Sequence, residues 1–193
     1  MRDYNYFEIY LNTLVDDIYE QPVDEGHTRM ALNVIDTWIP KLVGCKSVVD
    51  MGCGQIAPQG AFEQYGLSYL GISIGRDVVE AVKAGKSVIN EDMTFTKLDS
   101  ESFDLVYSRH SLEHSPFPLL TLMEWHRIAK HWLCLVLPSP AHYGWVGKNH
   151  YGVMNFDQAK SFLERAGWNI IWSDTSEPTE IRLMCEKVQK KWD

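Results

Sequence analysis

An aspartate and two glycines mark the first place in this sequence where chemistry could be done. The stretch Ser47–Gly54 reads Ser-Val-Val-Asp-Met-Gly-Cys-Gly, so a strand-like run leads into Asp50, and Gly52 and Gly54 follow at alternate positions. Glycine can take a positive φ, and because it lacks a Cβ it lets a ligand approach the backbone closely. The pattern predicts a ligand site at the carboxyl end of a buried strand.

Two common nucleotide loops can be compared with this stretch. A phosphate-binding loop is excluded because no Gly-Lys-Ser/Thr follows the glycines. The dinucleotide pattern G-x-G-x-x-G is incomplete, since Ala57 stands at its third glycine, and a nicotinamide dinucleotide site stays open on this motif alone. Asp50, however, would repel a pyrophosphate and attract a positively charged group. The loop therefore favours a ligand that carries an ammonium.

Alternating strand and helix patterns must position this loop. Strand composition predicts strands at Ser47–Asp50, Leu67–Ile74, Ser87–Asn90, Phe103–Ser108, Trp132–Leu137, Trp168–Trp172 and Ile181–Glu186. Apolar periodicity predicts helices at Tyr4–Tyr19, Thr28–Leu42, Gly60–Tyr65, Asp77–Ala84 and Phe156–Ala166, and one that starts at Ser115 and Pro116. Such alternation indicates a mostly parallel sheet with helices on both faces. We also expect most of the tryptophans in these periodic runs to be core residues, namely Trp38, Trp125, Trp132, Trp168 and Trp172.

Size and composition limit the class of protein. The chain has 193 residues, enough for one well-filled domain, and we divide it into a helical extension or lid at 1–45 and a catalytic domain at 46–193. A net charge of −8 argues against a nucleic-acid partner, which needs a basic surface. No run of apolar residues is long enough to span a membrane. The oligomeric state is left open.

The cysteines and histidines give little support to a metal or disulfide framework. Four cysteines fall at wide spacings without a C-x-x-C pair, and the seven histidines form no helical H-x-x-x-H motif. We therefore expect no metal, reduced thiols and a cytoplasmic location. The first residues lack a basic start followed by an apolar run, so we expect no signal peptide.

The ordered motifs resemble those of the class I S-adenosylmethionine-dependent methyltransferases. The series is Val-Val-Asp-Met-Gly-Cys-Gly, then Tyr-Leu-Gly-Ile-Ser-Ile, then Asp92, then Phe103–His114, which ends in Leu-Glu-His. The chain is similar in particular to the small-molecule and lipid-modifying branch with this last signature. The resemblance covers 47–167, and it implies a Rossmann-like three-layer α/β sandwich with a seven-stranded type of sheet and an antiparallel last strand.

The resemblance implies a set of cofactor-binding positions. Asp50 and the backbone of Gly52, Cys53 and Gly54 would hold the methionine part of S-adenosylmethionine. Further positions that match the family's site are Ser73, Ile74, Asp92, Met93 and Ser108. Asp92 would accept from the adenine amino group. Ser73 departs from the family, which has an acid there for the ribose hydroxyls; Arg76 or Asp77 could compensate for the missing carboxylate.

The resemblance also implies the reaction and its base. Methyl transfer from a sulfonium is a direct displacement, so positioning dominates and a base is needed only for a protonated acceptor. His110, at the end of a strand and with an ordinary pKa near neutrality, is the preferred base; His114 is a second candidate or a brace for the loop. Aromatic and histidine residues after the fifth strand are expected to bind the acceptor, namely Tyr143, Trp145 and His150.

These expectations add up to an enzyme that methylates oxygen or nitrogen of a small molecule, with S-adenosylhomocysteine as the other product. The missing acid at Ser73 keeps open an alternative, a non-catalytic or degenerate cofactor-binding module that acts as a partner or regulator. A nicotinamide oxidoreductase would require NAD(H) to bind in preference. Base methylation of nucleic acid is disfavoured, because Ser108-Arg-His-Ser stands where an Asn/Asp-Pro-Pro-Tyr/Phe signature would be.

Overall fold

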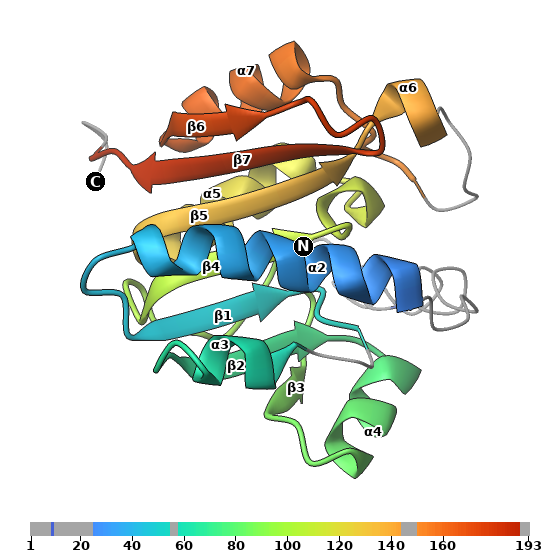
Figure 1. Ribbon diagram of the computed structural model, residues 1–193, viewed down its shortest axis with the longest axis vertical. Helices are drawn as coiled ribbons and strands as arrows, with labels where there is room; N and C mark the ends of the chain where they lie inside the picture. The colour runs from blue at the N-terminus through green and yellow to red at the C-terminus, as the bar shows by residue number, and fades with distance from the viewer. Residues whose placement is uncertain (1–8, 10–24, 55–57, 144–149, 190–193) are drawn as a thin grey trace, which may run out of the picture.

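A seven-stranded sheet forms the centre of the molecule (Figure 1). The computed structural model describes residues 9, 25–54, 58–143 and 150–189. In chain order the strands are β1 (Ser47–Met51), β2 (Ser68–Ser73), β3 (Val88–Asn90), β4 (Phe103–Arg109), β5 (Ala129–Pro138), β6 (Trp168–Asp174) and β7 (Glu180–Lys187). Their spatial order is β3-β2-β1-β4-β5-β7-β6, and β7 runs antiparallel to both of its neighbours while the other pairs are parallel. The predicted Rossmann-like α/β class with an antiparallel last strand is confirmed.

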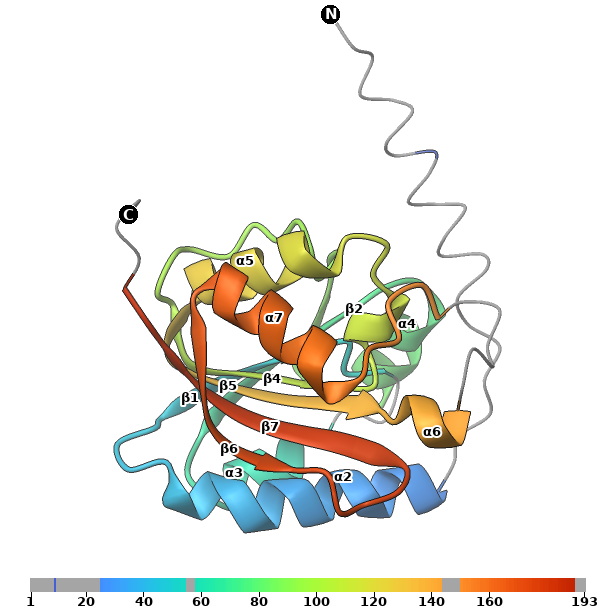
Figure 2. The same cartoon turned by 90° about the horizontal axis from the view of Figure 1, so that it is seen from above.

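Helices cover both faces of this sheet (Figure 2). Helices α5 (Pro118–Ile128) and α7 (Phe156–Ala166) lie on one face, and α2 (Glu25–Trp38) and α3 (Gln59–Glu63) lie on the other. The remaining elements are the short helices η1 (Ile39–Lys41), α4 (Arg76–Lys83), η2 (Leu112–His114) and α6 (Pro140–Tyr143). Two buried apolar clusters fill the spaces on either side of the sheet. None of the helices in the described part of the chain is long and apolar enough to cross a bilayer.

Helix α2 packs on the sheet through one apolar stripe. Its Val34, Ile35 and Trp38 are 0 to 3% exposed and share a cluster with Phe62 of α3. These three residues recur at helical spacing, so the predicted helix has its apolar face against the core. Of the predicted helix at 4–19, only Ile9 lies within the described residues, and it is helical.

Two local expectations differ from the structure. Helix α5 begins at Pro118 rather than at Ser115 and Pro116, because η2 and a turn come first; the Ser115 hydroxyl accepts from Phe117 N at 3.1 Å. Trp172 is 40% exposed rather than a core residue. It lies on β6, the edge strand of the sheet, which has a neighbouring strand on one side only. Its ring packs edge to face against that of Trp38, with the ring centroids 4.2 Å apart.

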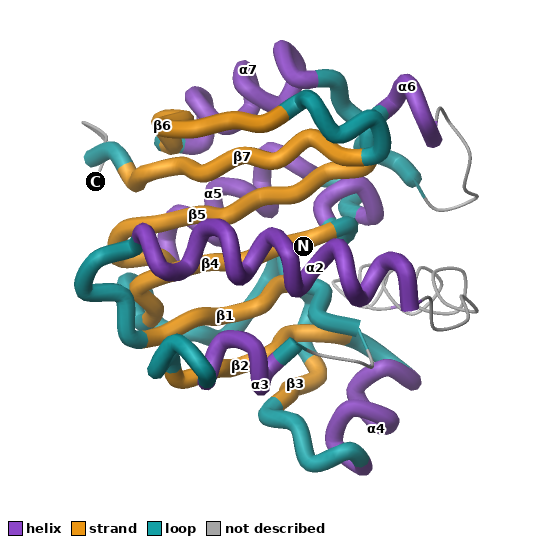
Figure 3. The backbone as a smooth tube through the Cα atoms, viewed as in Figure 1, coloured by secondary structure: helices purple, strands orange, loops and turns teal. Residues whose placement is uncertain are grey.

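The parallel strands bring several chain segments to one edge of the sheet. Strands β1, β2, β3 and β4 point the same way, so the loops that follow them leave from the same side (Figure 3). The residues at these exits are Gly52, Ser73, Asn90 and His110. Ligands of open α/β sheets bind at this kind of edge.

Candidate active site

The glycine loop after β1 is held tightly against two neighbours. Gly52 and Gly54 have φ of 75° and 61°, a region that L side chains rarely adopt. The amides of Gly52 and Cys53 both donate to Ile72 O, at 2.9 and 3.0 Å. A Cβ on Gly52 would lie 2.3 Å from the Cβ of Ser111. Residue 52 must therefore be glycine, because the segment after β4 packs where a side chain would lie.

Serine side chains fasten the segment after β4 to the end of β1. Ser111 Oγ donates to Met51 O at 2.7 Å and hydrogen-bonds the hydroxyl of Ser108. Ser108 and Ser111 are 0% and 2% exposed. The position of η2 relative to the glycine loop is thus fixed by buried hydrogen bonds, which are costly to leave unmade.

Asp50 is buried and accepts a hydrogen bond from a tyrosine hydroxyl, a contact that the sequence did not predict. Its side chain is 2% exposed, and Tyr69 Oη donates to it at 2.9 Å. Burial raises the pKa of Asp50 to about 7, although the hydrogen bond from Tyr69 acts in the opposite direction. Burial, with the nearby charge of Asp50, also raises the pKa of the Cys53 thiol, so Cys53 is not a reactive thiolate. The carboxyl of Asp50 is poised to change charge near neutral pH.

An acid lies beside the glycine loop although Ser73 is not one. Ser73 ends β2, is 5% exposed, and its carbonyl accepts from Glu91 N at 3.1 Å. Ile74 follows it, half-buried. Asp77, in the first turn of α4, places Oδ2 3.8 Å from where a Cβ on Gly54 would lie. Burial raises the pKa of Asp77, and the charge of Arg76 opposes that shift.

The segment after β3 is tied to α5. One carboxylate oxygen of Asp92 accepts from Thr94 N at 2.7 Å, so this oxygen caps a turn. The carbonyl of Met93 accepts from Trp125 Nε1 at 3.0 Å. The buried hydroxyls of Thr94 and Thr121 are 2.8 Å apart. These bonds hold Asp92 and Met93 beside the sheet edge, with both side chains half-buried.

His110 belongs to an ion-pair network around a buried glutamate of β7. His110 has φ of 50°, and its Nε2 lies 3.1 Å from Glu180 Oε1. Arg109 Nε and Nη2 donate to the same oxygen at 3.0 and 2.6 Å, and Arg182 Nε donates to Oε2 at 3.0 Å. Burial alone would raise the pKa of Glu180, but the hydrogen bonds and charges of these partners bring it down to about 2. No local sequence signal marks Glu180, which lies 71 residues after Arg109.

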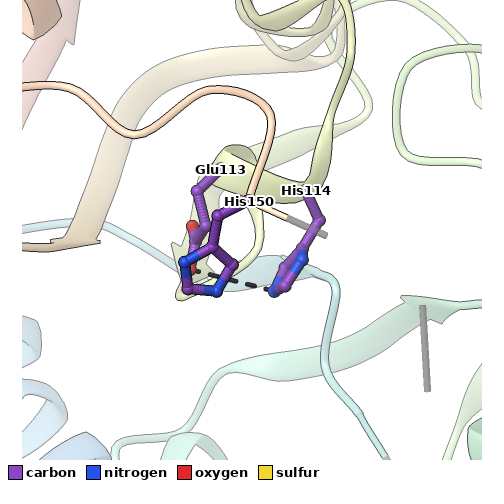
Figure 4. Close-up of side chains that lie close together, drawn as sticks. All are labelled: Glu113, His114 and His150. Carbon is purple, nitrogen blue, oxygen red and sulfur yellow. Dashed lines mark ion pairs between the residues drawn. The ribbon is translucent and has the colours of Figure 1, made fainter. Parts of the chain in front are cut away.

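A second group gathers around η2 (Figure 4). Glu113 and His114 come from η2, and His150 comes from the segment before α7; one potential ligand atom of each lies within 4.8 Å of the others. Burial raises the pKa of Glu113 to about 8 and lowers the pKa of His150. Histidine and carboxylate side chains in such a group can hold a metal ion. The spacing of these residues in the sequence did not predict the grouping.

The expected acceptor loop is placed only in part. Tyr143 ends α6, Trp145 lies outside the described residues, and His150 joins the group at η2. The ring of His150 meets that of His114 edge to face, with centroids 4.9 Å apart. Among the described side chains, that of His150 therefore lies next to one candidate base, His114.

Comparison with known proteins gives a family match over part of the chain and a shared fold. Residues 49–132 match the model of a family described as a methyltransferase domain. No curated protein matches the sequence of this chain.

Solved structures with the same fold include an S-adenosylmethionine-dependent methyltransferase from Archaeoglobus fulgidus, at 17% identity and TM-score 0.68, over 82% of this chain and 94% of that one. Magnesium protoporphyrin IX methyltransferase of Synechocystis, solved with bound S-adenosylhomocysteine, is 15% identical, with TM-score 0.67 over 95% and 97% of the chains. A Haloferax volcanii complex of a methyltransferase activator with a methyltransferase matches at 15% identity and TM-score 0.68, over 86% and 95%.

The family match and the fold agree with the motifs at the sheet edge. The matched residues span β1 with its glycine loop, β4 and the segment that carries His110 and His114. The fold is shared with the structures above, at TM-scores of 0.67 to 0.68. Residues 49–132 therefore match the methyltransferase domain family, and the chain has the fold of solved S-adenosylmethionine-dependent methyltransferases.

Proposed function

We propose that this protein is an S-adenosylmethionine-dependent methyltransferase that acts on an oxygen or nitrogen atom of a small molecule. The observation that carries the choice of acceptor is the net charge of −8, because a nucleic-acid substrate would call for a basic surface. Free thiols at the four cysteines support a cytoplasmic location. The Synechocystis relative, which acts on a porphyrin, supports the size class of the acceptor.

The residues at the edge of the sheet fit the cofactor. Gly54 has only Asp77 Oδ2 within 4 Å of its Cβ position, so its backbone is open to a ligand, and the buried Asp50 would offer a carboxylate for an ammonium. Asp77 faces the Gly54 side, where it would hold ribose hydroxyls in place of the missing acid at Ser73. The half-buried Ile74, Asp92 and Met93 would complete the site, and the buried Ser108 would hold the segment after β4 beside it. When bound, S-adenosylmethionine supplies a methyl group on a sulfonium.

His110 is the base in this proposal. Glu180 and its arginine partners fix the imidazole at the carboxyl end of β4, as an orienting carboxylate does in other acid–base pairs. An alcohol acceptor would give its proton to His110 as its oxygen attacks the methyl carbon. An acceptor that enters as a free amine would need no base.

The acceptor class is tested by labelled methyl transfer. The purified protein and methyl-labelled S-adenosylmethionine would be offered to three pools in turn: extracted metabolites, RNA and protein. Label in the metabolite pool, with stoichiometric release of S-adenosylhomocysteine, is the expected result. Label that enters RNA or protein and leaves the metabolites unlabelled would overturn the proposed acceptor class.

The charge of Asp50 makes cofactor binding pH-dependent. The raised pKa of about 7 leaves the carboxyl protonated at lower pH, whereas an ammonium ligand requires the ionised form. Affinity for S-adenosylhomocysteine, measured by calorimetry, should therefore rise by up to about tenfold per pH unit from pH 5 and level off above about 7. Asp50→Asn should weaken binding by roughly 10- to 150-fold and flatten this slope, since a charge-assisted bond contributes about 1.5–3 kcal/mol.

Asp36→Asn is the matched control, because exposed Asp36 accepts from Tyr65 as Asp50 does from Tyr69. This variant should bind like the wild type. Adenosine, which lacks the amino acid part, should bind the wild type and Asp50→Asn alike. An unchanged S-adenosylhomocysteine affinity in Asp50→Asn would remove Asp50 from the site.

Asp77 should affect a different part of the same ligand. Asp77→Asn should weaken S-adenosylhomocysteine and adenosine together, by about tenfold or more, because both carry the ribose that a carboxylate would grip. Calorimetry with the two ligands measures the effect, and Glu80→Gln on the same helix serves as the control, since Glu80 pairs with Lys83. A loss confined to S-adenosylhomocysteine would contradict a ribose role.

A further inference from the structure

We propose that Glu113, His114 and His150 bind one divalent transition-metal ion. Their ligand atoms all lie within 4.8 Å of one another, and Glu113 Oε1 is 3.9 Å from His114 Nε2. An ion with ligand bonds of about 2.0–2.2 Å holds neighbouring ligand atoms about 3–3.5 Å apart. Side-chain movements on the order of 1 Å would therefore close the group around an ion (Figure 4).

Unsatisfied atoms point to a cation at this place. Glu113 is 1% exposed, and within the described part of the chain its Oε2 has no hydrogen-bond partner. Nδ1 of His150 is buried and lacks a partner among the same residues. A buried carboxylate is costly unless it is paired or coordinates a metal. A bound cation would satisfy the carboxylate and use the imidazoles beside it.

The backbone holds the two segments that carry these ligands together. Gly152 N donates to Glu113 O at 2.9 Å, two residues after His150. A Cβ on Gly152 would contact Leu112 O at 3.6 Å and Ser115 O at 3.5 Å, so this segment lies closely against η2. His114 N in turn donates to Ser111 O at 3.0 Å. Ligands on braced segments bind an ion without first ordering the chain.

The ligand types indicate which ion would bind. Two imidazoles and one carboxylate suit Zn²⁺, Mn²⁺, Fe²⁺, Co²⁺ or Ni²⁺ rather than Ca²⁺, which prefers six to eight oxygens. Three protein ligands leave at least one position open for water or another oxygen. Ser111, two residues before Glu113, contacts the glycine loop, so the segment that carries two of the ligands packs against the candidate cofactor site.

A role for the ion rests on the proposed function. An acceptor that carries a hydroxyl or carboxylate oxygen could occupy the open position and be oriented there, and metal coordination lowers the pKa of a bound hydroxyl. His114 would then be a metal ligand, and His110, paired with Glu180, would remain the base.

Metal binding can be measured without knowing the acceptor. The full chain would be stripped with a chelator, dialysed and titrated with MnCl₂ by electron paramagnetic resonance, and with ZnCl₂ by calorimetry. We expect about one ion per chain, with affinity reduced at least tenfold in Glu113→Gln and in His150→Ala. His131→Ala, which removes an exposed histidine of β5, should bind as the wild type does.

Circular dichroism would establish that each variant is folded. His150→Ala keeps the test valid if Glu113→Gln fails to fold, because His150 lies in a loop segment outside the core. The proposal is overturned if the wild type binds no ion at millimolar metal, or if both variants bind like the wild type. Binding of S-adenosylhomocysteine, titrated separately, tests the proposed function: its loss with metal binding intact would leave the metal site standing.

Discussion

Gly52→Ala should destabilise the protein by roughly 2–5 kcal/mol and abolish cofactor binding. A positive φ costs an L residue about 1–2 kcal/mol, and overpacking costs typically about 1–3 kcal/mol more. The new methyl would lie 2.3 Å from Ser111 Cβ, which is attached to backbone and cannot swing aside. Relief would require the glycine loop and the segment after β4 to separate. Urea denaturation measures the stability, and calorimetry with S-adenosylhomocysteine measures the binding.

Gly44→Ala is a matched control that measures the cost of a positive φ without a steric clash. Gly44 has φ of 82°, but nothing lies within 4 Å of where its Cβ would be. This variant should lose only the conformational term of about 1–2 kcal/mol. Equal losses in the two variants would show that Ser111 does not constrain the loop.

A double mutant sharpens the same test. Ser111→Gly removes the atom that the new methyl meets, so Gly52→Ala should cost less in its presence, with a coupling free energy of about 1 kcal/mol or more. Ser111→Gly alone also loses the hydrogen bonds of Ser111 to Met51 and Ser108. The double-mutant cycle subtracts the free-energy change of this single variant, so the coupling reports only the contact between residues 52 and 111. A coupling near zero would argue that the two segments move apart freely.

Glu180→Gln should lower the free energy of unfolding by about 3–5 kcal/mol at pH 7. Glu180 is 0% exposed, and removing its charge leaves Arg109 and Arg182, 10% and 18% exposed, without their buried counter-charge. Glu177→Gln is the control from the same turn, because Glu177 is 33% exposed and 4.0 Å from Arg182 Nη2. It should change stability by less than about 1 kcal/mol. Urea unfolding of the three proteins gives both values.

The low pKa of Glu180 also makes its contribution to stability depend on pH. A folded-state pKa of about 2, below the ordinary value of 4.5, stabilises the protein above about pH 4.5, and this contribution is lost as the pH falls toward 2. The loss amounts to about 3 kcal/mol in the wild type and should be absent from Glu180→Gln. If the free energies of unfolding of the wild type and Glu180→Gln fall equally as the pH drops below 4.5, Glu180 does not have the lowered pKa. His110 should lose its fixed position in the same variant, so activity on an alcohol acceptor should fall even where the protein is folded.

The order of elements could be predicted because each element is specified locally. The valine-rich run before Asp50, the glycines after it and the apolar periodicity of Phe156–Ala166 give a strand, a loop and a helix without reference to distant residues. Alternation of such units then limits the topology to a few parallel sheets. Boundaries were less certain, as at Pro118, because a serine before a proline can cap a helix or make a turn.

The sequence by itself determined the fold class and the glycine loop after the first strand, because strands and the loops that follow them are specified by neighbouring residues. Only the tertiary structure decided which side chains meet across that edge. Glu180 reaches His110 because β7 pairs with β5 in antiparallel register, and His150 reaches Glu113 because the chain before α7 packs on η2. Such contacts join residues tens of positions apart. They depend on how the whole core packs, and no local pattern carries that information.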